Sequence, residues 1–226
     1  MMPSSFSFSR TNDHSMWLQQ LAATQWWQQV PIEKVENILL PLKQSPSEPH
    51  GSRIGSMRMA LEQSLLTAPL IPSASAPHSE SALELQSAVR DLVQSLSDVD
   101  IPPAFERMFG HPSTRLAVYG SLRPGESNHN QLATVPGNWQ DGSVKGSIKR
   151  PGEYLEFTWD VCSSEVAVKV LTSDRLCDHF DRLDEFEGED YCRILVPVMI
   201  AEKVQICHIY EGVRPFYHLG PISNDV

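Results

Sequence analysis

The sequence predicts an α+β fold in which a helical N-terminal extension precedes a β-rich domain that forms a compact barrel or a curled sheet. Two observations support this prediction. Between about residues 16 and 97, apolar residues recur with the spacing of amphipathic helices. After Arg115, short runs rich in Val, Ile and aromatic residues alternate with Gly, Pro, Asp and Ser. We place the boundary near residue 110, with the extension at residues 1–110 and the β-rich domain at residues 111–226.

The extension contains two stripes of apolar residues repeating at i, i+3, i+4 and i+7, over residues 35–42 and residues 85–96. One stripe per segment predicts that each helix packs one face against a neighbour. Residues 44–52 and 68–81 are rich in Pro, Ser and Ala and are predicted to be loops or linkers. Residues 100–115 then lead into the first strand of the β-rich domain.

The β-rich domain contains about six predicted strands, in runs enriched in β-branched and aromatic residues. These runs are residues 115–120, 142–148, 154–161, 165–172, 192–200 and 204–212. One amphipathic helix interrupts them, with Ser173 as its expected N-cap and Gly188 as its expected stop. Its apolar residues are predicted to share one face: Leu176, Phe180, Leu183 and Phe186.

The charge balance and hydropathy argue against two classes of protein. The formal net charge is -10, from 28 acidic and 18 basic residues, and no dense basic cluster offers phosphate contacts, so we expect no nucleic-acid binding. Nowhere do about 18 apolar residues run together, and the N-terminal residues lack a basic segment followed by an apolar core. We therefore expect no membrane association and a cytoplasmic location.

The cysteines and histidines do not suggest a metal site. The four cysteines lie at intervals of fifteen residues, at Cys162, Cys177, Cys192 and Cys207, but their neighbouring residues share no pattern. No pair has the two-residue separation of a zinc knuckle or a redox motif, and the histidines lack the HExxH spacing. We interpret the cysteines as reduced thiols and expect no metal and no cofactor.

The stretch LAVYGSLRPGESNHNQL, residues 116–132, passes from a predicted strand into turn-forming and polar residues. A strand ending at Tyr119 leaves the backbone N–H groups of Gly120, Ser121 and Leu122 without ladder partners. Glycine permits a close approach or an unusual φ, so these groups can point at an anion or a developing oxyanion. The alternative is an ordinary turn without a ligand, because Gly and Ser are common turn residues.

The stretch LDEFEGEDYCR, residues 183–193, contains several acidic residues around the end of the predicted helix. Glu187 lies just before the helix stop, where a carboxylate meets the unfavourable end of the helix dipole. If Glu187 points into an apolar cavity, burial raises its pKa and makes it suited to proton transfer near neutral pH. The other acids of this stretch are predicted to form a solvated face: Asp184, Glu185, Glu189 and Asp190.

Together the motifs VYGSLRPGESNH and LDEFEGEDYCR resemble the γ-glutamylcyclotransferase superfamily, in particular its γ-glutamylamine cyclotransferase and avirulence-induced-gene-like branch. GEYLEF and IYEG support the resemblance, which covers roughly residues 115 to 216. It implies a small mixed β-barrel with a single essential glutamate, at the position of Glu187. Members convert a γ-glutamyl amide into 5-oxoproline and a free amine, without a cofactor, when the substrate's own α-amine attacks its γ-carbonyl.

The resemblance also implies a small-molecule γ-glutamyl substrate held near the first motif. The N–H groups of Gly120, Ser121 and Leu122 would hold either the substrate's α-carboxylate or the oxyanion of the tetrahedral intermediate. Arg123 and Asn128 are expected to shape this loop rather than to contact the substrate.

Four further residues are candidates for substrate binding. Tyr119 either lines the cavity or ends a strand, and Tyr210 either reaches the cavity or packs in the core. Arg193 either pairs with a carboxylate such as Glu187, which would lower the pKa of that glutamate, or stabilises the fold. Tyr191 is the fourth candidate.

Two functions of different classes remain open on this basis. The first is a cyclotransferase whose extension is an accessory or oligomerisation element, since the catalytic module of such proteins ordinarily stands alone. The second is a non-catalytic binding or regulatory protein that keeps the barrel as a scaffold and docks a partner through its helices. Trp17, Trp26 and Trp27 are consistent with a protein partner or self-association, although packing against the barrel is the more economical explanation.

Overall fold

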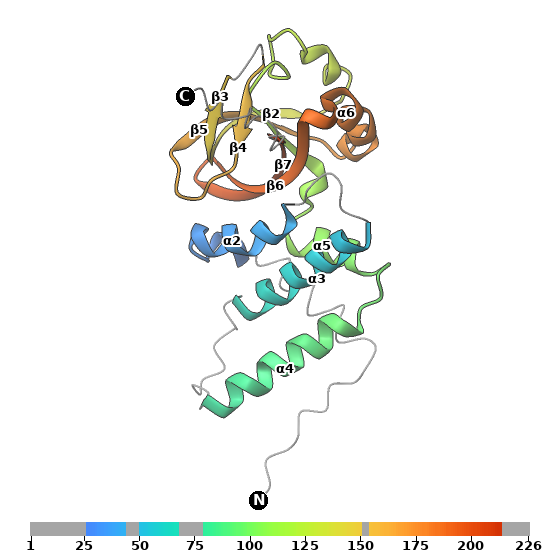
Figure 1. The fold of residues 1–226 in the computed structure, drawn as a ribbon, viewed down its shortest axis with the longest axis vertical. Coiled ribbons are helices and arrows are strands. Elements are labelled where there is room, and N and C mark those ends of the chain that lie inside the picture. Colours follow the sequence, from blue (N-terminus) through green and yellow to red (C-terminus); the bar gives the residue numbers. More distant parts are fainter. Residues whose placement is uncertain (1–25, 44–49, 68–78, 151–153, 214–226) are drawn as a thin grey trace, which may run out of the picture.

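A computed structural model describes residues 26–43, 50–67, 79–150 and 154–213. A closed five-stranded barrel forms one end of the molecule, and helices of the N-terminal region lie beneath it, with helix α4 farthest from the barrel (Figure 1). The barrel has the strand order β1-β5-β2-β6-β7. Its strands are β1 (Arg115–Val118), β2 (Asn138–Lys145), β5 (Glu165–Thr172), β6 (Tyr191–Ile200) and β7 (Lys203–Gly212). The α+β fold with a mixed barrel and a helical N-terminal region is thus confirmed.

One parallel contact, between Leu116 of β1 and His208 of β7, closes the barrel, and the other strand pairs are antiparallel. A separate two-stranded sheet pairs β3 (Ser147–Lys149) with β4 (Glu156–Thr158). Strand β7 is buried without interruption from residue 206 to residue 211. Such a continuous run is typical of a strand that is covered on both faces, here by the barrel interior and the N-terminal region.

The predicted amphipathic helix forms in two parts, a 3-10 turn η5 (Leu176–His179) and helix α6 (Phe180–Glu187). The hydroxyl of Ser173 accepts a hydrogen bond from the N–H of Arg175 at 3.1 Å, so it caps the turn before the helix rather than the helix itself. Gly188 ends α6 with a φ of 67°, as predicted, and a second 3-10 turn η6 (Gly188–Asp190) leads into β6.

The apolar face of this segment differs from the prediction at one position. Leu176, Phe180 and Leu183 are buried, but Phe186 keeps 40% of its surface exposed. It lies in the last turn of α6, and its side chain lines the mouth of a pocket instead of entering the core. The prediction that Phe186 faces inward is therefore wrong.

The N-terminal region is helical, as predicted. It contains η1 (Trp26–Gln28), α2 (Ile32–Leu39), η2 (Leu40–Leu42), α3 (His50–Thr67), α4 (Ser79–Ser95) and α5 (Ile101–Met108), followed by η3 (Pro112–Thr114). In the first predicted stripe Val35, Ile38 and Leu39 are buried, and Val89 and Val93 are buried in the second. The predicted loops at 44–52 and 68–81 lie mostly outside the described residues, although their last residues already belong to α3 and α4.

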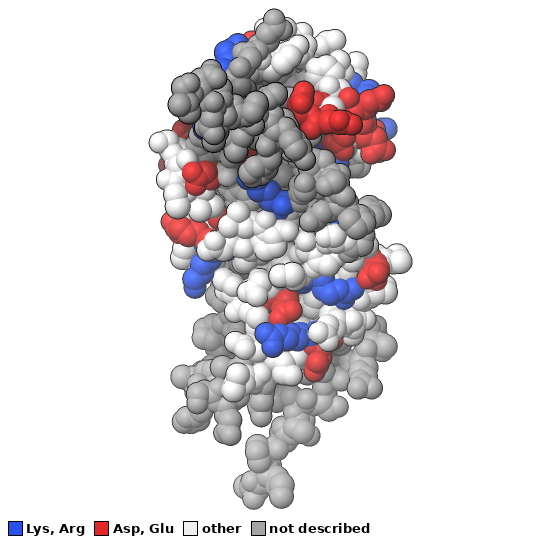
Figure 2. Space-filling view, viewed as in Figure 1, with Lys and Arg blue, Asp and Glu red and all other residues white. Residues whose placement is uncertain are grey.

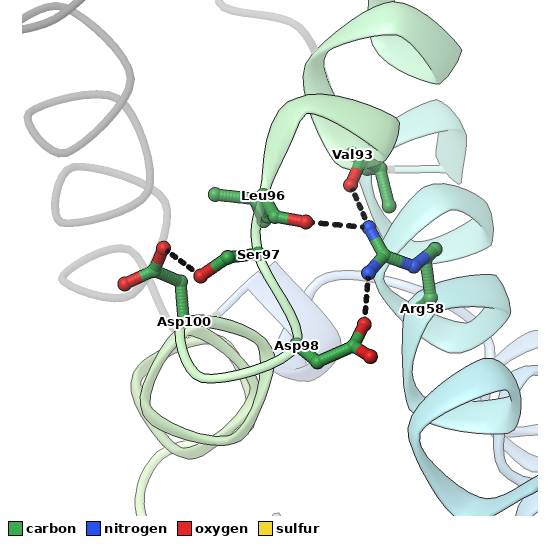
Figure 3. Close-up of polar contacts among 6 residues, drawn as sticks. All are labelled: Arg58, Val93, Leu96, Ser97, Asp98 and Asp100. Atoms are coloured by element: carbon green, nitrogen blue, oxygen red, sulfur yellow. Dashed lines mark hydrogen bonds and ion pairs between the residues drawn. The ribbon is translucent and has the colours of Figure 1, made fainter. Parts of the chain in front are cut away.

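Arg58 holds three helical segments together (Figure 3). From α3, its guanidinium donates hydrogen bonds to the carbonyls of Val93 and Leu96 at the end of α4. It also pairs with Asp98 at 2.9 Å, in the turn that leads to α5. Helix ends leave carbonyl groups without intrahelical partners, so a cation at this place satisfies them and fixes the turn.

The N-terminal region and the barrel share one hydrophobic core. Trp26, Trp27 and Phe105 belong to the same buried cluster as Val196 and Ile206 of the barrel. The predicted packing of the tryptophans against the barrel therefore holds for Trp26 and Trp27, whereas Trp17 lies outside the described residues. None of the described helices is both long enough and apolar enough to cross a membrane.

Candidate active site

A pocket of about 610 Å³ opens at one end of the barrel. Its wall is formed by the end of β1 and the loop after it, the end of α6, the start of β6, and β7. Seven of the eight candidate residues line this pocket: Tyr119, Gly120, Ser121, Leu122, Glu187, Tyr191 and Tyr210. Arg193 does not line it.

Hydrogen bonds within the loop after β1 fix its shape. The Nδ2 of Asn128 donates to the hydroxyl of Ser121 at 2.9 Å, and its backbone N–H donates to the carbonyl of Ser121 at 3.0 Å. The guanidinium of Arg123 donates to the carbonyl of Gly120 at 3.2 Å and pairs with Glu126 at 3.1 Å. Arg123 and Asn128 thus shape the loop, and both also line the pocket.

The backbone N–H groups of Gly120, Ser121 and Leu122 have no hydrogen-bond partner among the described residues. Partly buried N–H groups of this kind ordinarily bind water or a ligand. The loop therefore offers adjacent donors to an anion in the pocket.

The surroundings of Gly120 indicate the role of glycine in this loop. Its φ is not positive, and a Cβ built at this position would meet no atom within 4 Å. Neither the backbone conformation nor a neighbouring group therefore requires glycine here. The open space beside Gly120 belongs to the pocket, which favours a role in the close approach of a ligand.

Glu187 is the last residue of α6, and its half-buried side chain lines the pocket. Burial raises the pKa of Glu187 to about 7, and the negative charge of Asp184 adds to this effect. None of the described residues donates a hydrogen bond to Glu187 or forms an ion pair with it. The carboxyl group can therefore exist in both protonation states near neutral pH, as a proton-transfer group requires.

Arg193 pairs with Asp184, not with Glu187. Its Nε and a terminal nitrogen donate to the two oxygens of Asp184, at 2.8 and 2.9 Å, and its guanidinium lies over the ring of Phe180, 4.0 Å from the centroid. Arg193 therefore stabilises the structure next to the pocket and does not lower the pKa of Glu187 through a direct ion pair.

Asp184 departs only in part from the prediction of a solvated acid, because 41% of its side-chain surface is exposed but its oxygens also accept hydrogen bonds from the barrel. It accepts both hydrogen bonds of Arg193 and a third from the hydroxyl of Tyr210 at 2.7 Å. Burial opposes ionisation, but the hydrogen bonds of Arg193 and Tyr210 outweigh it and lower the pKa of Asp184. The sequence holds no signal for this role, because both partners lie on strands that follow the helix.

The remaining acids around α6 are exposed, as predicted: Glu185, Glu189 and Asp190. In Figure 2 acidic side chains gather at the upper right of the molecule, where Figure 1 places α6. Asp190 also lines the pocket. This acidic surface surrounds the end of the helix that carries Glu187.

The tyrosines of the pocket are held by hydrogen bonds. The hydroxyl of Tyr119 accepts from the N–H of Phe157 at 3.2 Å, and that of Tyr191 donates to the carbonyl of Leu155 at 3.0 Å. Burial raises the pKa of Tyr119, Tyr191 and Tyr210, so all three are neutral at physiological pH. They form a fixed, uncharged wall around Glu187.

A family model described as gamma-glutamyl cyclotransferase, AIG2-like matches residues 116–218. This match supports a cyclotransferase type of function in general terms and covers the motifs that form the pocket. A search of curated protein sequences found no match.

Several solved structures resemble the chain. YkqA from Bacillus subtilis is 29% identical, with a TM-score of 0.38, and the match covers 44% of this chain and 35% of YkqA. The protein PH0828 from Pyrococcus horikoshii is 24% identical, with a TM-score of 0.35, over 45% of this chain and 80% of that protein. An AIG2-like protein from Mus musculus is 18% identical, with a TM-score of 0.37, over 44% of this chain and 77% of that protein.

Proposed function

We propose that the protein is an enzyme that cleaves a γ-glutamyl amide into 5-oxoproline and a free amine or amino acid, since residues 116–218 match the family model described as gamma-glutamyl cyclotransferase, AIG2-like. One observation carries the proposal. The carboxyl group of Glu187, with a pKa of about 7, lines the same pocket as the N–H groups of Gly120, Ser121 and Leu122. A proton acceptor and an anion site are the two elements that this reaction needs.

The substrate supplies both reacting groups. Its α-amine attacks its γ-carbonyl carbon, a five-membered ring forms, and the bond from that carbon to the amide nitrogen breaks. Because ring closure is intramolecular, the pocket acts mainly by holding the glutamyl chain in a folded conformation. A pocket of about 610 Å³ is within the usual range for a small molecule.

Glu187 transfers the proton. An α-amino group has a pKa of about 7.7 to 8.0, so a large part of the substrate enters protonated at neutral pH and cannot attack. In its ionised form Glu187 removes a proton from this ammonium group, which frees the amine to attack. After the attack the ring nitrogen gives up a second proton, and both protons pass to the leaving nitrogen. The amine therefore departs as an ammonium ion, and no water is consumed. General acid-base catalysis of this kind contributes on the order of 10²- to 10⁴-fold.

The loop after β1 binds negative charge. The N–H groups of Gly120, Ser121 and Leu122 hold either the α-carboxylate of the substrate or the oxyanion of the tetrahedral intermediate. In the first case they align the glutamyl group, and in the second they stabilise the transition state directly. Tyr119 and Tyr191 line the same cavity and restrict the conformation of the bound chain.

The test is an assay of 5-oxoproline release by the full chain. The substrates are a panel of γ-glutamyl amines, γ-glutamyl dipeptides and glutathione, and Glu187→Gln is compared with Glu185→Gln. Glu185 is an exposed acid on the same helix, so its variant controls for the loss of one negative charge. We expect product from the wild type and from Glu185→Gln, and none from Glu187→Gln. Absence of product from every member of the panel would contradict the proposal.

A further inference from the structure

The pocket is bordered by a carboxylate that the reaction above does not use. Asp184 lies on α6 three residues before Glu187, which places the two side chains on neighbouring turns of the same helix face. Asp184 itself is not among the residues that line the pocket. It therefore acts on the site by its charge and through the groups that it holds, not by contact with a bound molecule.

Asp184 connects α6 to two strands of the barrel. Its oxygens accept hydrogen bonds from Arg193, on β6, and from Tyr210, on β7, at distances of 2.7 to 2.9 Å. Arg193 is itself fixed, because its guanidinium lies over the ring of Phe180 at the start of α6. The positive charge of Arg53, from α3, also favours the ionised form of Asp184. The carboxylate is therefore held by three hydrogen bonds and is negatively charged.

We propose that Asp184 is a positioning residue for Glu187: it fixes the last turn of α6 against β6 and β7 and holds a permanent negative charge one helical turn from the catalytic carboxyl. This inference rests on the proposed function, in which Glu187 transfers the proton. The charge of Asp184 adds to burial in raising the pKa of Glu187. Without it, Glu187 would be a weaker proton acceptor at neutral pH.

Other ionisable groups also face Glu187 across the pocket. The hydroxyls of Tyr119, Tyr191 and Tyr210 are neutral at physiological pH. Four charged side chains line the rim: Arg123, Glu126, Arg150 and Asp190. All of these remain in an Asp184 variant, so a change in the titration of Glu187 reports on Asp184.

The main test compares Asp184→Asn with Glu185→Gln in the full chain. Asparagine keeps the shape and an oxygen acceptor for Tyr210, but it removes the charge. The titration of Glu187 is followed by NMR of 13C-labelled carboxyl groups, which needs no turnover. We expect its midpoint in Asp184→Asn to move to lower pH by about half a unit or more, and that of Glu185→Gln to stay unchanged. A folded Asp184→Asn protein with the wild-type midpoint would overturn the inference.

The kinetics of two further variants test whether Asp184 positions Glu187. Tyr210→Phe and Arg193→Lys keep the charge of Asp184 but loosen its contacts. We expect both to lower kcat about tenfold or more, while the midpoint of the pH profile stays within a few tenths of a unit. If both fold and keep the wild-type kcat, Asp184 does not position Glu187. Since the NMR titration does not depend on a substrate, failure of the panel assay would contradict the proposed function alone.

Discussion

Trp27 donates a hydrogen bond from its indole Nε1 to the backbone carbonyl of Val204 at 3.1 Å, across 177 residues of sequence. The indole is almost fully buried, and Gly110 passes so close to it that a Cβ there would lie 2.7 Å from its Cζ2 atom. Gly110 also has a φ of 68°, which favours glycine. The N-terminal region therefore packs closely against the barrel.

Replacement of Trp27 should destabilise the whole protein. Trp27→Ala removes a large buried side chain together with its hydrogen bond, so we expect the free energy of unfolding to fall by about 3 to 5 kcal/mol. Trp27→Phe keeps much of the packing and should lower the free energy of unfolding by a smaller amount. Urea denaturation followed by circular dichroism gives both values. An alanine variant as stable as the wild type would mean that the helices and the barrel unfold separately.

We propose that the domain boundary near residue 110 does not mark an independent folding unit. Lys43 pairs with the buried carboxylate of Glu211 at 2.5 Å, and Glu211 also accepts a hydrogen bond from the N–H of Trp159 at 2.7 Å. Removal of residues 1–110 deletes Lys43 and exposes apolar surface on the barrel. A fragment of residues 111–226 should therefore be insoluble or unfolded. A soluble fragment with wild-type activity would make the extension an accessory element.

The half-buried carboxyl of Glu187 should lower the stability of the protein at high pH. In the unfolded chain it ionises near pH 4.3, but in the folded protein its pKa is about 7, so between these values the folded state binds more protons. The stability that this group contributes is complete below pH 4.3 and is lost as the pH rises through 7. The loss amounts to about 4 kcal/mol.

The glutamine side chain of the Glu187→Gln variant cannot ionise, so the variant should not lose this stability as the pH rises. We expect its Tm to exceed that of the wild type at pH 8, with a smaller difference at pH 5. Thermal unfolding of Glu185→Gln at the same two pH values is the control, because its carboxyl is exposed. An equal difference at both pH values would show that the pKa of Glu187 is not raised.

Gly120 should matter for activity more than for folding. Since a Cβ at this position meets no atom within 4 Å, Gly120→Ala should keep the wild-type Tm while its methyl group occupies part of the pocket. We expect a loss of kcat/KM of about tenfold or more, because the methyl group prevents close approach to the N–H groups. Gly55→Ala, in α3, also meets no atom and should be fully active. Unchanged kinetics in Gly120→Ala would place the substrate elsewhere.

The strands were predictable where their residues alternate or are β-branched throughout. Residues 165–172 form β5 with the predicted bounds. The predicted run at 142–148 is divided at Gly146 between β2 and β3, and this position requires glycine because a Cβ there would lie 2.4 Å from a ring atom of Phe157. Strand β2 begins four residues earlier than predicted, since polar residues from Asn138 pair with β5. Sequence patterns do not reveal such pairing partners.

The pocket was predictable from two local motifs, but the hydrogen bonds that hold Asp184 beside it were not. Gly120 and Glu187 belong to recognisable stretches, and each motif keeps its residues near one another in the chain. The role of Asp184 depends on its hydrogen bonds with Arg193 and Tyr210. The packing of α6 against two strands brings these residues close to it. Phe186 was predicted to be buried because helical spacing continues to the end of α6, yet the helix reaches the pocket mouth there.

The most direct test of the account is the measurement of 5-oxoproline released by the purified full chain from the panel of γ-glutamyl substrates, beside the Glu187→Gln variant. The account predicts product from at least one γ-glutamyl substrate with the wild-type protein and none with a folded Glu187→Gln protein. Equal product from both proteins would remove Glu187 from the mechanism. No product from any substrate would contradict the proposed reaction and favour a binding role for the barrel.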